Sequence, residues 1–343
     1  MRQLKNTLYV FTEDAYLALN GKNVVVRHEG GELGRIPLHT LEAIVSFAYP
    51  GASPALMAAC SEAGVQLSFC DQRGRFLASA QGEVSGNVLL RREQYRWADD
   101  PQRSLLVARN FVAGKVYNCR WVLGRCLRDH GPRVDGETMG AVCERLGEAV
   151  AAARRSESLD SLRGVEGAAA DAYFSVFDQM LLRDPQTFYF HGRTRRPPTD
   201  PVNAMLSLFY SALVRECASA LSAVGLDPYV GFMHTDRPGR RSLALDLMEE
   251  LRPVVVDRFV ITAVNNRVVG ASCFEFRETG EVRLTDEGRR ALFSAWQDRK
   301  RETMTHPFLE EKIPWGLVPF VQAQLLARCI RGDLDAYPPL LWK

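Results

Sequence analysis

The residues best suited to chemistry lie between positions 231 and 252, in the stretch GFMHTDRPGRRSLALDLMEELR. It contains one histidine, His234, followed by an Arg-Pro-Gly turn. A predicted helix then carries Asp246, Glu249 and Glu250. Because helical residues three and four apart share a face, the three carboxylates crowd together and repel one another. A divalent cation would relieve that repulsion, and a histidine nitrogen with carboxylate oxygens suits Mg²⁺ or Mn²⁺.

A simpler explanation of this stretch is a helix with a solvated acidic face, which charge spacing alone favours. The apolar residues around the acids argue the other way, because Leu243, Leu247 and Leu251 indicate a helix that is mostly buried. Buried carboxylates need partners. Both explanations remain open from spacing and composition.

A further carboxylate, Glu166, lies in the stretch LRGVEGAAADAYF among glycines and alanines. Small neighbours allow another element, or a phosphate group, to approach a helix closely. Taken alone, Glu166 is equally consistent with a helix-surface acid, and Asp171 is a nearby competitor.

Other common chemistries lack their signature motifs in this sequence. No G-x-G-x-x-G follows a predicted strand and no G-x-x-x-x-G-K-[ST] loop occurs, which disfavours nucleotide-driven work. There is no G-x-S-x-G or H-E-x-x-H motif, and no cysteine has an obvious histidine partner nearby. Acidic groups, one histidine and several arginines remain. This set fits metal-dependent phosphodiester chemistry better than acyl transfer or redox chemistry.

Length and composition favour a soluble cytoplasmic protein of two domains. The 343 residues exceed one typical domain, and 46% hydrophobic with 24% charged residues is ordinary for a globular chain. The net charge of +2 does not by itself announce nucleic-acid binding. The eight cysteines form no C-x-x-C pair, as expected of reduced core residues. No signal peptide and no apolar run of about 20 residues is predicted, so no membrane partner is expected.

The elements that must position the candidate residues change character along the chain. Residues 1–88 show short alternating apolar runs, including a hairpin signal at Asn20–Asn23, and predict a β-rich domain for assembly. Residues 89–104 are polar and predict a linker. Residues 105–343 show helical periodicity, so the fold class is α+β. The helices are predicted at 101–128, 137–153, 202–223, 254–264, 285–299 and 316–331, with one more beginning near 242.

Basic residues gather around the predicted linker and the first long helix. The segment from Arg91 to Arg128 contains nine Lys and Arg residues and only three acidic residues, and Tyr95 and Trp97 lie among the basic ones. A basic face with aromatic side chains suits a nucleic-acid backbone. On charge alone, a solvated helix face explains this region equally well.

Three motifs together resemble one known family. The stretches LRGVEGAAADAYF, RTRRPPTDPVNAMLSLFYSAL and GFMHTDRPGRRSLALDLMEELRP are similar, in order and spacing, to the CRISPR adaptation integrases of the Cas-one (Cas1) family. The likeness extends over the whole chain, and the ending HPFLEEKIPWGLVPFVQAQLLARCIRGDLDAYPPLLWK resembles the subtype I-C branch. The resemblance implies a β-rich N-terminal dimerisation domain followed by an α-helical catalytic domain that binds metal and DNA.

The resemblance also implies a catalytic metal site for Mg²⁺ or Mn²⁺. The first carboxylate matches Glu166 and the histidine matches His234. Many members have Asp at the position of Glu249 and another Asp three residues earlier, which matches Asp246. We favour Glu249 as the third ligand, one methylene longer than the usual Asp, and keep Asp246 as the second choice.

The activity implied by the resemblance is that of a metal-dependent DNA endonuclease and integrase. It inserts foreign fragments at the leader end of a CRISPR array, by attack of a 3′-hydroxyl on a repeat phosphodiester, during the adaptation stage of antiviral defence. The alternatives are a general metal-dependent nuclease on branched or double-stranded DNA and a non-catalytic DNA-binding structural protein.

The partners implied by the resemblance are double-stranded and branched DNA, a second copy of the chain, and a Cas-two (Cas2) dimer that bridges two homodimers. A Cas-four (Cas4) nuclease is expected to help trim the fragments. Basic residues would hold the DNA backbone. The candidates for DNA binding are Arg91, Arg92, Arg109, Lys115, Arg195 and Arg196.

Overall fold

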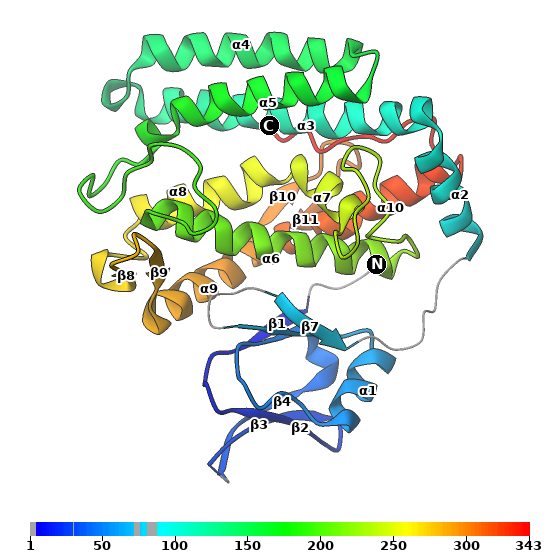
Figure 1. Cartoon of the computed structure of the whole chain (residues 1–343), viewed down its shortest axis with the longest axis vertical. Coiled ribbons are helices and arrows are strands. Elements are labelled where there is room, and N and C mark those ends of the chain that lie inside the picture. The colour runs from blue at the N-terminus through cyan, green and yellow to red at the C-terminus, as the bar shows by residue number, and fades with distance from the viewer. Residues whose placement is uncertain (1–4, 30, 72–75, 81–87) are drawn as a thin grey trace.

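The protein consists of a β-rich N-terminal part and a larger helical C-terminal part (Figure 1). The structure, a computed structural model, describes residues 5–29, 31–71, 76–80 and 88–343. This arrangement confirms the α+β fold class. The two parts lie one above the other, with strands β1–β7 at the lower end of the view (Figure 1).

Among its described residues, the N-terminal part contains two sheets and one α-helix. The larger sheet has the order β1-β5-β6-β7, with β7 antiparallel to β6 and the other neighbours parallel. The smaller sheet is the antiparallel meander β2-β3-β4, whose first turn is the predicted hairpin and uses Gly21 at a φ of 60°. The elements are β1 (Asn6–Val10), β2 (Tyr16–Asn20), β3 (Asn23–His28), β4 (Gly31–Pro37), β5 (Leu41–Ser46), α1 (Pro54–Glu62), β6 (Gln66–Cys70) and β7 (Phe76–Ala80).

The helical part contains nine α-helices and two short hairpins among its described residues. Helix α7 runs into α8 through a π-helical segment, Arg252–Asp257. The helices are α2 (Val88–Asp99), α3 (Pro101–His130), α4 (Gly136–Arg155), α5 (Leu159–Ser175), α6 (Pro201–Ala223), α7 (Ser242–Glu249), α8 (Arg258–Asn265), α9 (Asp286–Arg301) and α10 (Val318–Ile330). The hairpins are β8 (Phe274–Phe276) with β9 (Val282–Leu284), and β10 (Thr303–Thr305) with β11 (Lys312–Pro314).

The segment expected to be a polar linker, 89–104, is helical instead. It forms most of α2 and the start of α3, and Asp100 caps α3 by accepting hydrogen bonds from two backbone N–H groups. Helix α2 packs on α3 and α10 through a narrow face that carries Leu90 and Gln94, whose amide donates to two carbonyls of the 227–230 loop. Its remaining residues are mostly polar, which is why composition concealed a helix. The domain boundary itself stays a prediction.

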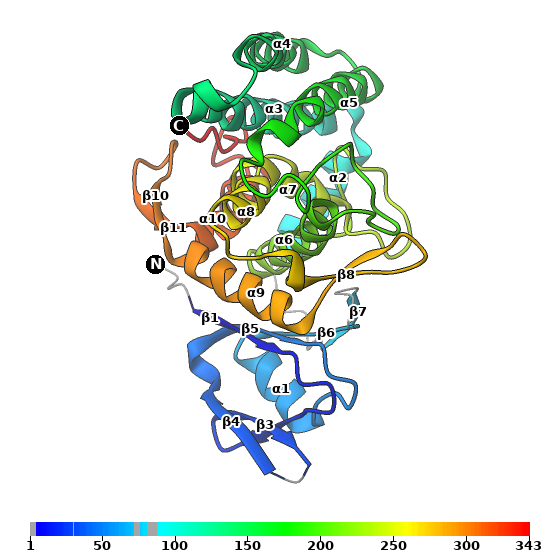
Figure 2. The ribbon, with the colours of Figure 1, turned by 90° about the vertical axis from the view of Figure 1, so that its left-hand side faces the viewer.

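The two parts pack through α9, which lies over the β1-β5-β6 sheet (Figure 2). The ring of Tyr9 lies 4.2 Å from that of Phe293 on α9. Beside them, the buried ammonium of Lys300 lies 2.7 Å from Glu42 on β5 and 3.2 Å from Glu216 on α6. The ion pairs tie sheet, α9 and α6 together, because a buried ammonium needs such partners.

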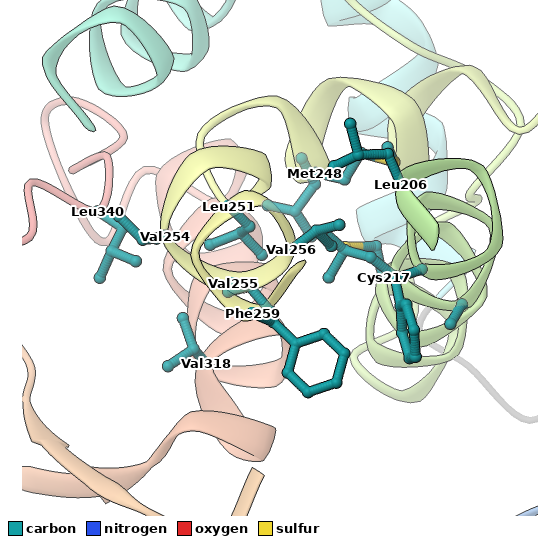
Figure 3. Packing of buried hydrophobic residues seen from close by; sticks show 14 of the residues in the cluster. Leu206, Cys217, Met248, Leu251, Val254, Val255, Val256, Phe259, Val318 and Leu340 are labelled. Atoms are coloured by element: carbon teal, nitrogen blue, oxygen red, sulfur yellow. The ribbon is translucent and has the colours of Figure 1, made fainter. Parts of the chain in front are cut away.

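The core of the helical part fixes the helix that carries the acidic cluster. Val254, Val256 and Phe259 pack between α6 and α10, against Cys217 and Val318 (Figure 3). This burial anchors the π-helical segment that follows α7. Helix α6 is long and apolar enough to cross a membrane by length and composition alone, but 67% of its most apolar window is buried, as in a core helix.

Candidate active site

Three helices bring two carboxylates and one ammonium group together. Lys115 lies in the middle of α3, Glu166 on α5 and Glu249 at the end of α7. The Lys115 Nζ hydrogen-bonds the Glu166 carboxylate and lies 2.7 Å from Oε2 of Glu249. Lys115 is only 8% exposed. Burial lowers the pKa of Lys115, but the two carboxylates outweigh it and the pKa is raised.

The small residues around Glu166 leave open space on α5. No described atom beyond the local helix lies within 4 Å of a Cβ built at Gly164 or Gly167. Ala169 of the same stretch is instead buried in the core, where α5 packs on α3 and α4, so close packing of other elements is one use of these small residues. The Glu166 side chain itself is 24% exposed.

Asp246 holds the loop that carries His234. Its Oδ2 accepts hydrogen bonds from the backbone N–H groups of Phe232 at 2.6 Å and Met233 at 3.0 Å. Its Oδ1 accepts from the His234 backbone N–H at 2.9 Å and contacts His234 Nδ1 at 2.6 Å. Because a carboxylate only accepts, Nδ1 carries a proton, and in the neutral imidazole Nε2 then keeps its lone pair. Both Asp246 oxygens thus already accept hydrogen bonds, whereas Glu249 faces the Lys115 ammonium that it shares with Glu166.

Glycine is required where this loop meets α7. A Cβ on Gly231 would lie 2.8 Å from the Cβ of Ser242 and 2.9 Å from Asp246 Oδ2. On its other side the loop is braced by Arg163 of α5, which donates to the Met233 carbonyl at 2.7 Å. The loop therefore has little freedom to move His234.

Glu249 is a buried carboxylate in a cationic setting. Burial raises the pKa of Glu249, but Arg252 and Lys115 outweigh it and lower the pKa to about 2. Arg252 lies 3.1 Å from Oε1, and His234 Nε2 lies 4.0 Å from the same oxygen. The buried Oε2 has no hydrogen-bond partner among the described residues, although it pairs electrostatically with Lys115.

Arg252 is a site residue that we did not predict from the sequence. It follows Glu249 by three positions, and this spacing at a helix end was the available signal. Its guanidinium lies 4.9 Å from the ring centroid of Tyr210, whose hydroxyl donates to Asp257 at 2.5 Å. Burial raises the pKa of Asp257 to about 6. Arg252, the first residue of the π-helical segment, is thereby held between Glu249 of α7 and Tyr210 of α6.

The donor set fits a divalent cation. Two carboxylates and an imidazole nitrogen suit Mg²⁺ or Mn²⁺, and Oε2 of Glu249 faces the ammonium of Lys115. Within the described residues, no three His, Cys, Asp or Glu donors already surround an open point. The ammonium of Lys115 fills the position between Glu166 and Glu249, so it is the cation that the structure shows there.

The residues predicted to bind DNA fall into two groups. Arg92, Arg195 and Arg196 are exposed and Arg91 is half-buried. Arg109 instead uses Nε to hold the Ser156 carbonyl at 2.7 Å, and Lys115 is buried in the site described above.

Comparison with known proteins agrees with this architecture. A model of the family described as CRISPR associated protein Cas1 matches residues 8–298. A CRISPR-associated endonuclease Cas1 of Rhodospirillum rubrum is 48% identical over 347 residues, covering 100% of both chains. Another from Chlorobaculum tepidum is 45% identical over 343 residues, again covering 100% of both.

Solved structures share the fold at low identity. A casposase bound to integration product has a TM-score of 0.85 at 22% identity and covers 99% of this chain and 95% of its own. A Cas1 protein from Thermotoga maritima has a TM-score of 0.81 at 22% identity, with 95% and 97% covered. On the family match and the full-length relatives, this chain belongs to the Cas1 family of CRISPR-associated proteins.

Proposed function

We propose that this protein is a divalent-metal-dependent DNA endonuclease and integrase that inserts foreign DNA fragments into a CRISPR array in the cytoplasm. One observation carries the proposal: Glu166 and Glu249 share a single buried cation position, with His234 Nε2 4.0 Å from Glu249. Relatives over the whole chain are named endonucleases, and a casposase bound to integration product shares the fold.

Glu166, His234 and Glu249 would hold the ion, Mg²⁺ or Mn²⁺. When bound, such an ion lowers the pKa of a 3′-hydroxyl and offsets negative charge that develops on the attacked phosphodiester. Asp246 keeps the proton on Nδ1 of His234, so that Nε2 presents its lone pair to the site.

We assign the third ligand to Glu249 and the supporting role to Asp246. The Asp246 oxygens already accept from three backbone N–H groups and from His234. Glu249 has a buried oxygen that only Lys115 neutralises. The Arg252 and Lys115 cations keep Glu249 ionised, as a metal ligand must be.

The proposed partners follow the names of related proteins. In a Cas6-RT-Cas1–Cas2 complex, 36% of one chain matches 99% of this chain, at a TM-score of 0.81 and 22% identity. A Cas4/Cas1 fusion of Geobacter sulfurreducens is 35% identical to this chain over 334 residues. The match covers 96% of this chain and 59% of the fusion. We therefore propose a homodimer that assembles with Cas2, receives fragments trimmed by Cas4, and belongs to the subtype I-C branch.

The test is strand transfer of a labelled DNA fragment with free 3′-hydroxyls into a leader–repeat plasmid, with Cas2 supplied. We expect transfer only with Mg²⁺ or Mn²⁺, and its loss in Glu166→Gln. The matched control is Glu144→Gln, which removes an exposed acid of α4. Transfer by Glu166→Gln at the wild-type rate would contradict the proposal.

Two other results would favour the alternatives. Metal-dependent cleavage without any insertion would indicate a general nuclease. DNA binding without divalent-dependent cleavage or transfer would indicate a structural DNA-binding protein.

A further inference from the structure

A cavity of about 510 Å³ that is lined by basic side chains lies away from the carboxylate cluster. Arginines from three helices line it: Arg125 of α3, Arg258 of α8 and Arg299 of α9. Arg125 follows Lys115 by ten positions on α3, which places their backbones about 15 Å apart along the helix axis. The remaining wall comes from β10, Trp315, Trp342 and Lys343.

The three guanidinium groups are held together by two tryptophan rings. Arg258 lies 4.3 Å and Arg125 5.7 Å from the ring centroid of Trp342. Arg299 lies 4.6 Å from the ring centroid of Trp315, and the two rings are 6.1 Å apart. Cation–π contact of this kind stabilises an arginine without neutralising its charge.

The carboxylates near this cavity do not balance its arginines. Arg125 pairs with Asp129 at 3.2 Å, and Arg299 pairs with Glu302. Arg258 makes no ion pair with a carboxylate in the described part of the chain. Burial, together with the neighbouring Arg299 and Arg125, outweighs the opposing effect of Glu302 and Asp129 and lowers the pKa of Arg258 to about 10.

One arginine of the cavity wall also has a donor that is covered by protein and unused. The Nη2 of Arg299 is buried and has no hydrogen-bond partner among the residues that the structure describes. A buried N–H without an acceptor costs free energy, and on a guanidinium the natural acceptor is an oxyanion. A ligand in the cavity would therefore meet the excess positive charge of the three arginines, whereas this Nη2 is itself covered by protein.

We propose that this cavity is a phosphate-binding site. Guanidinium groups that converge from three helices match the several oxygens of a tetrahedral oxyanion better than the two of one carboxylate. Base stacking is disfavoured, because Trp315 and Trp342 are only 5% and 8% exposed. The phosphate would come from a DNA backbone or from a free phosphate ion, and the DNA source rests on the proposed function.

The first arm of the test measures thermal unfolding of the full chain in sodium phosphate and in sodium chloride of equal ionic strength. We expect phosphate to raise the Tm of the wild type more than chloride does. Arg258→Gln should remove most of that difference, weakening phosphate binding by roughly tenfold for one lost charge-assisted partner. Arg145→Gln, an exposed arginine of α4, is the matched control and should respond like the wild type.

A second variant and a second ligand keep the outcome clear. Arg125→Gln changes a more exposed side chain, 44% exposed, and should weaken the phosphate response even if Arg258→Gln folds poorly. Equal phosphate responses in the wild type and both folded variants would overturn the proposal. Stabilisation by polyglutamate but not by phosphate would also overturn it, because the site would then take a protein carboxylate.

The second arm identifies the source of the phosphate. Binding of a DNA duplex is measured by fluorescence anisotropy at fixed salt. Weaker DNA binding by both variants supports a backbone contact, whereas unchanged DNA binding with a lost phosphate response supports a free phosphate ion. Glu166→Gln should keep the full phosphate response, so failure of the proposed function and failure of this site give different results.

Discussion

The Nζ of Lys115 lies 2.7 Å from Oε2 of Glu249, and both side chains are buried. This ion pair joins α3 to α7, and the same ammonium also joins both to Glu166 on α5. A positive charge therefore stands between two carboxylates that would otherwise repel one another across the site. Substitution of Lys115 therefore tests whether Glu166 and Glu249 bind one cation together.

Lys115→Met should lower the free energy of unfolding of the metal-free protein and increase the rise in Tm that added metal causes. Removing one partner of a buried ion pair leaves charge uncompensated and costs about 3–5 kcal/mol. The same change removes the ammonium that now pairs with Glu166 and Glu249, so an added divalent cation can bind these carboxylates instead. Thermal unfolding with and without Mn²⁺ measures both effects. A metal-induced rise in Tm no larger than in the wild type would contradict the shared cation position.

Glu249→Gln and His234→Gln should each reduce Mn²⁺ affinity by at least about tenfold, because each removes or blunts one donor of a small ligand set. Isothermal titration with Mn²⁺ measures this directly and does not depend on catalysis. Glu144→Gln, an exposed acid, is the control. Unchanged affinity in Glu249→Gln would exclude it as a ligand.

Asp246→Asn should loosen the loop before α7 and lower metal affinity. An amide supplies only one acceptor oxygen, while Asp246 accepts from several N–H groups through both of its oxygens. We expect a stability loss of about 1–3 kcal/mol and an affinity loss of roughly 10- to 100-fold. Urea unfolding and Mn²⁺ titration measure the two losses. Asp335→Asn, a change at an exposed residue outside this loop, should change neither.

Gly231→Ala should destabilise the protein because the new methyl group meets the Ser242 backbone carbon at 2.9 Å. Backbone cannot move aside cheaply, so we expect a cost of about 1–3 kcal/mol. Gly140→Ala on α4 is the control, since a Cβ there meets nothing within 4 Å and a helical alanine is favourable. Urea midpoints for the two variants should move in opposite directions, and a shared direction would refute the packing argument.

Glu250→Gln should alter how stability depends on pH. Glu250 is fully buried; burial outweighs the hydrogen bonds from Tyr337, Gln322 and Leu340 and raises its pKa from 4.5 to about 7. A raised folded pKa means that the contribution of neutral Glu250 is complete below about pH 4.5 and is lost as the pH rises through about 7.

The variant should therefore gain stability relative to the wild type between pH 5 and pH 8, by on the order of 1–3 kcal/mol. Urea unfolding at several pH values measures the difference. Glu144→Gln removes an exposed acid and should follow the wild-type profile. A constant difference between Glu250→Gln and the wild type would show that Glu250 does not titrate in this range.

Periodicity predicted the long helices well. The helices predicted at 101–128, 202–223 and 285–299 correspond to α3, α6 and α9, because their apolar stripes are sustained over several turns. The polar segment 89–104 misled us, since α2 buries few side chains and one of its packing partners, α10, lies far away in the chain. The π-helical turn after α7 also left no signal in the spacing of its residues.

The sequence by itself determined the fold class, the order of the elements and a short set of candidate residues, because these depend on local spacing and residue type. Only the tertiary structure decided how the candidates relate. Lys115 reaches Glu166 over 51 positions, and Asp246 turns toward the His234 loop while Glu249 turns toward the shared site. Partners so distant meet only when helices pack, and packing decides which carboxylate oxygens remain available to a cation.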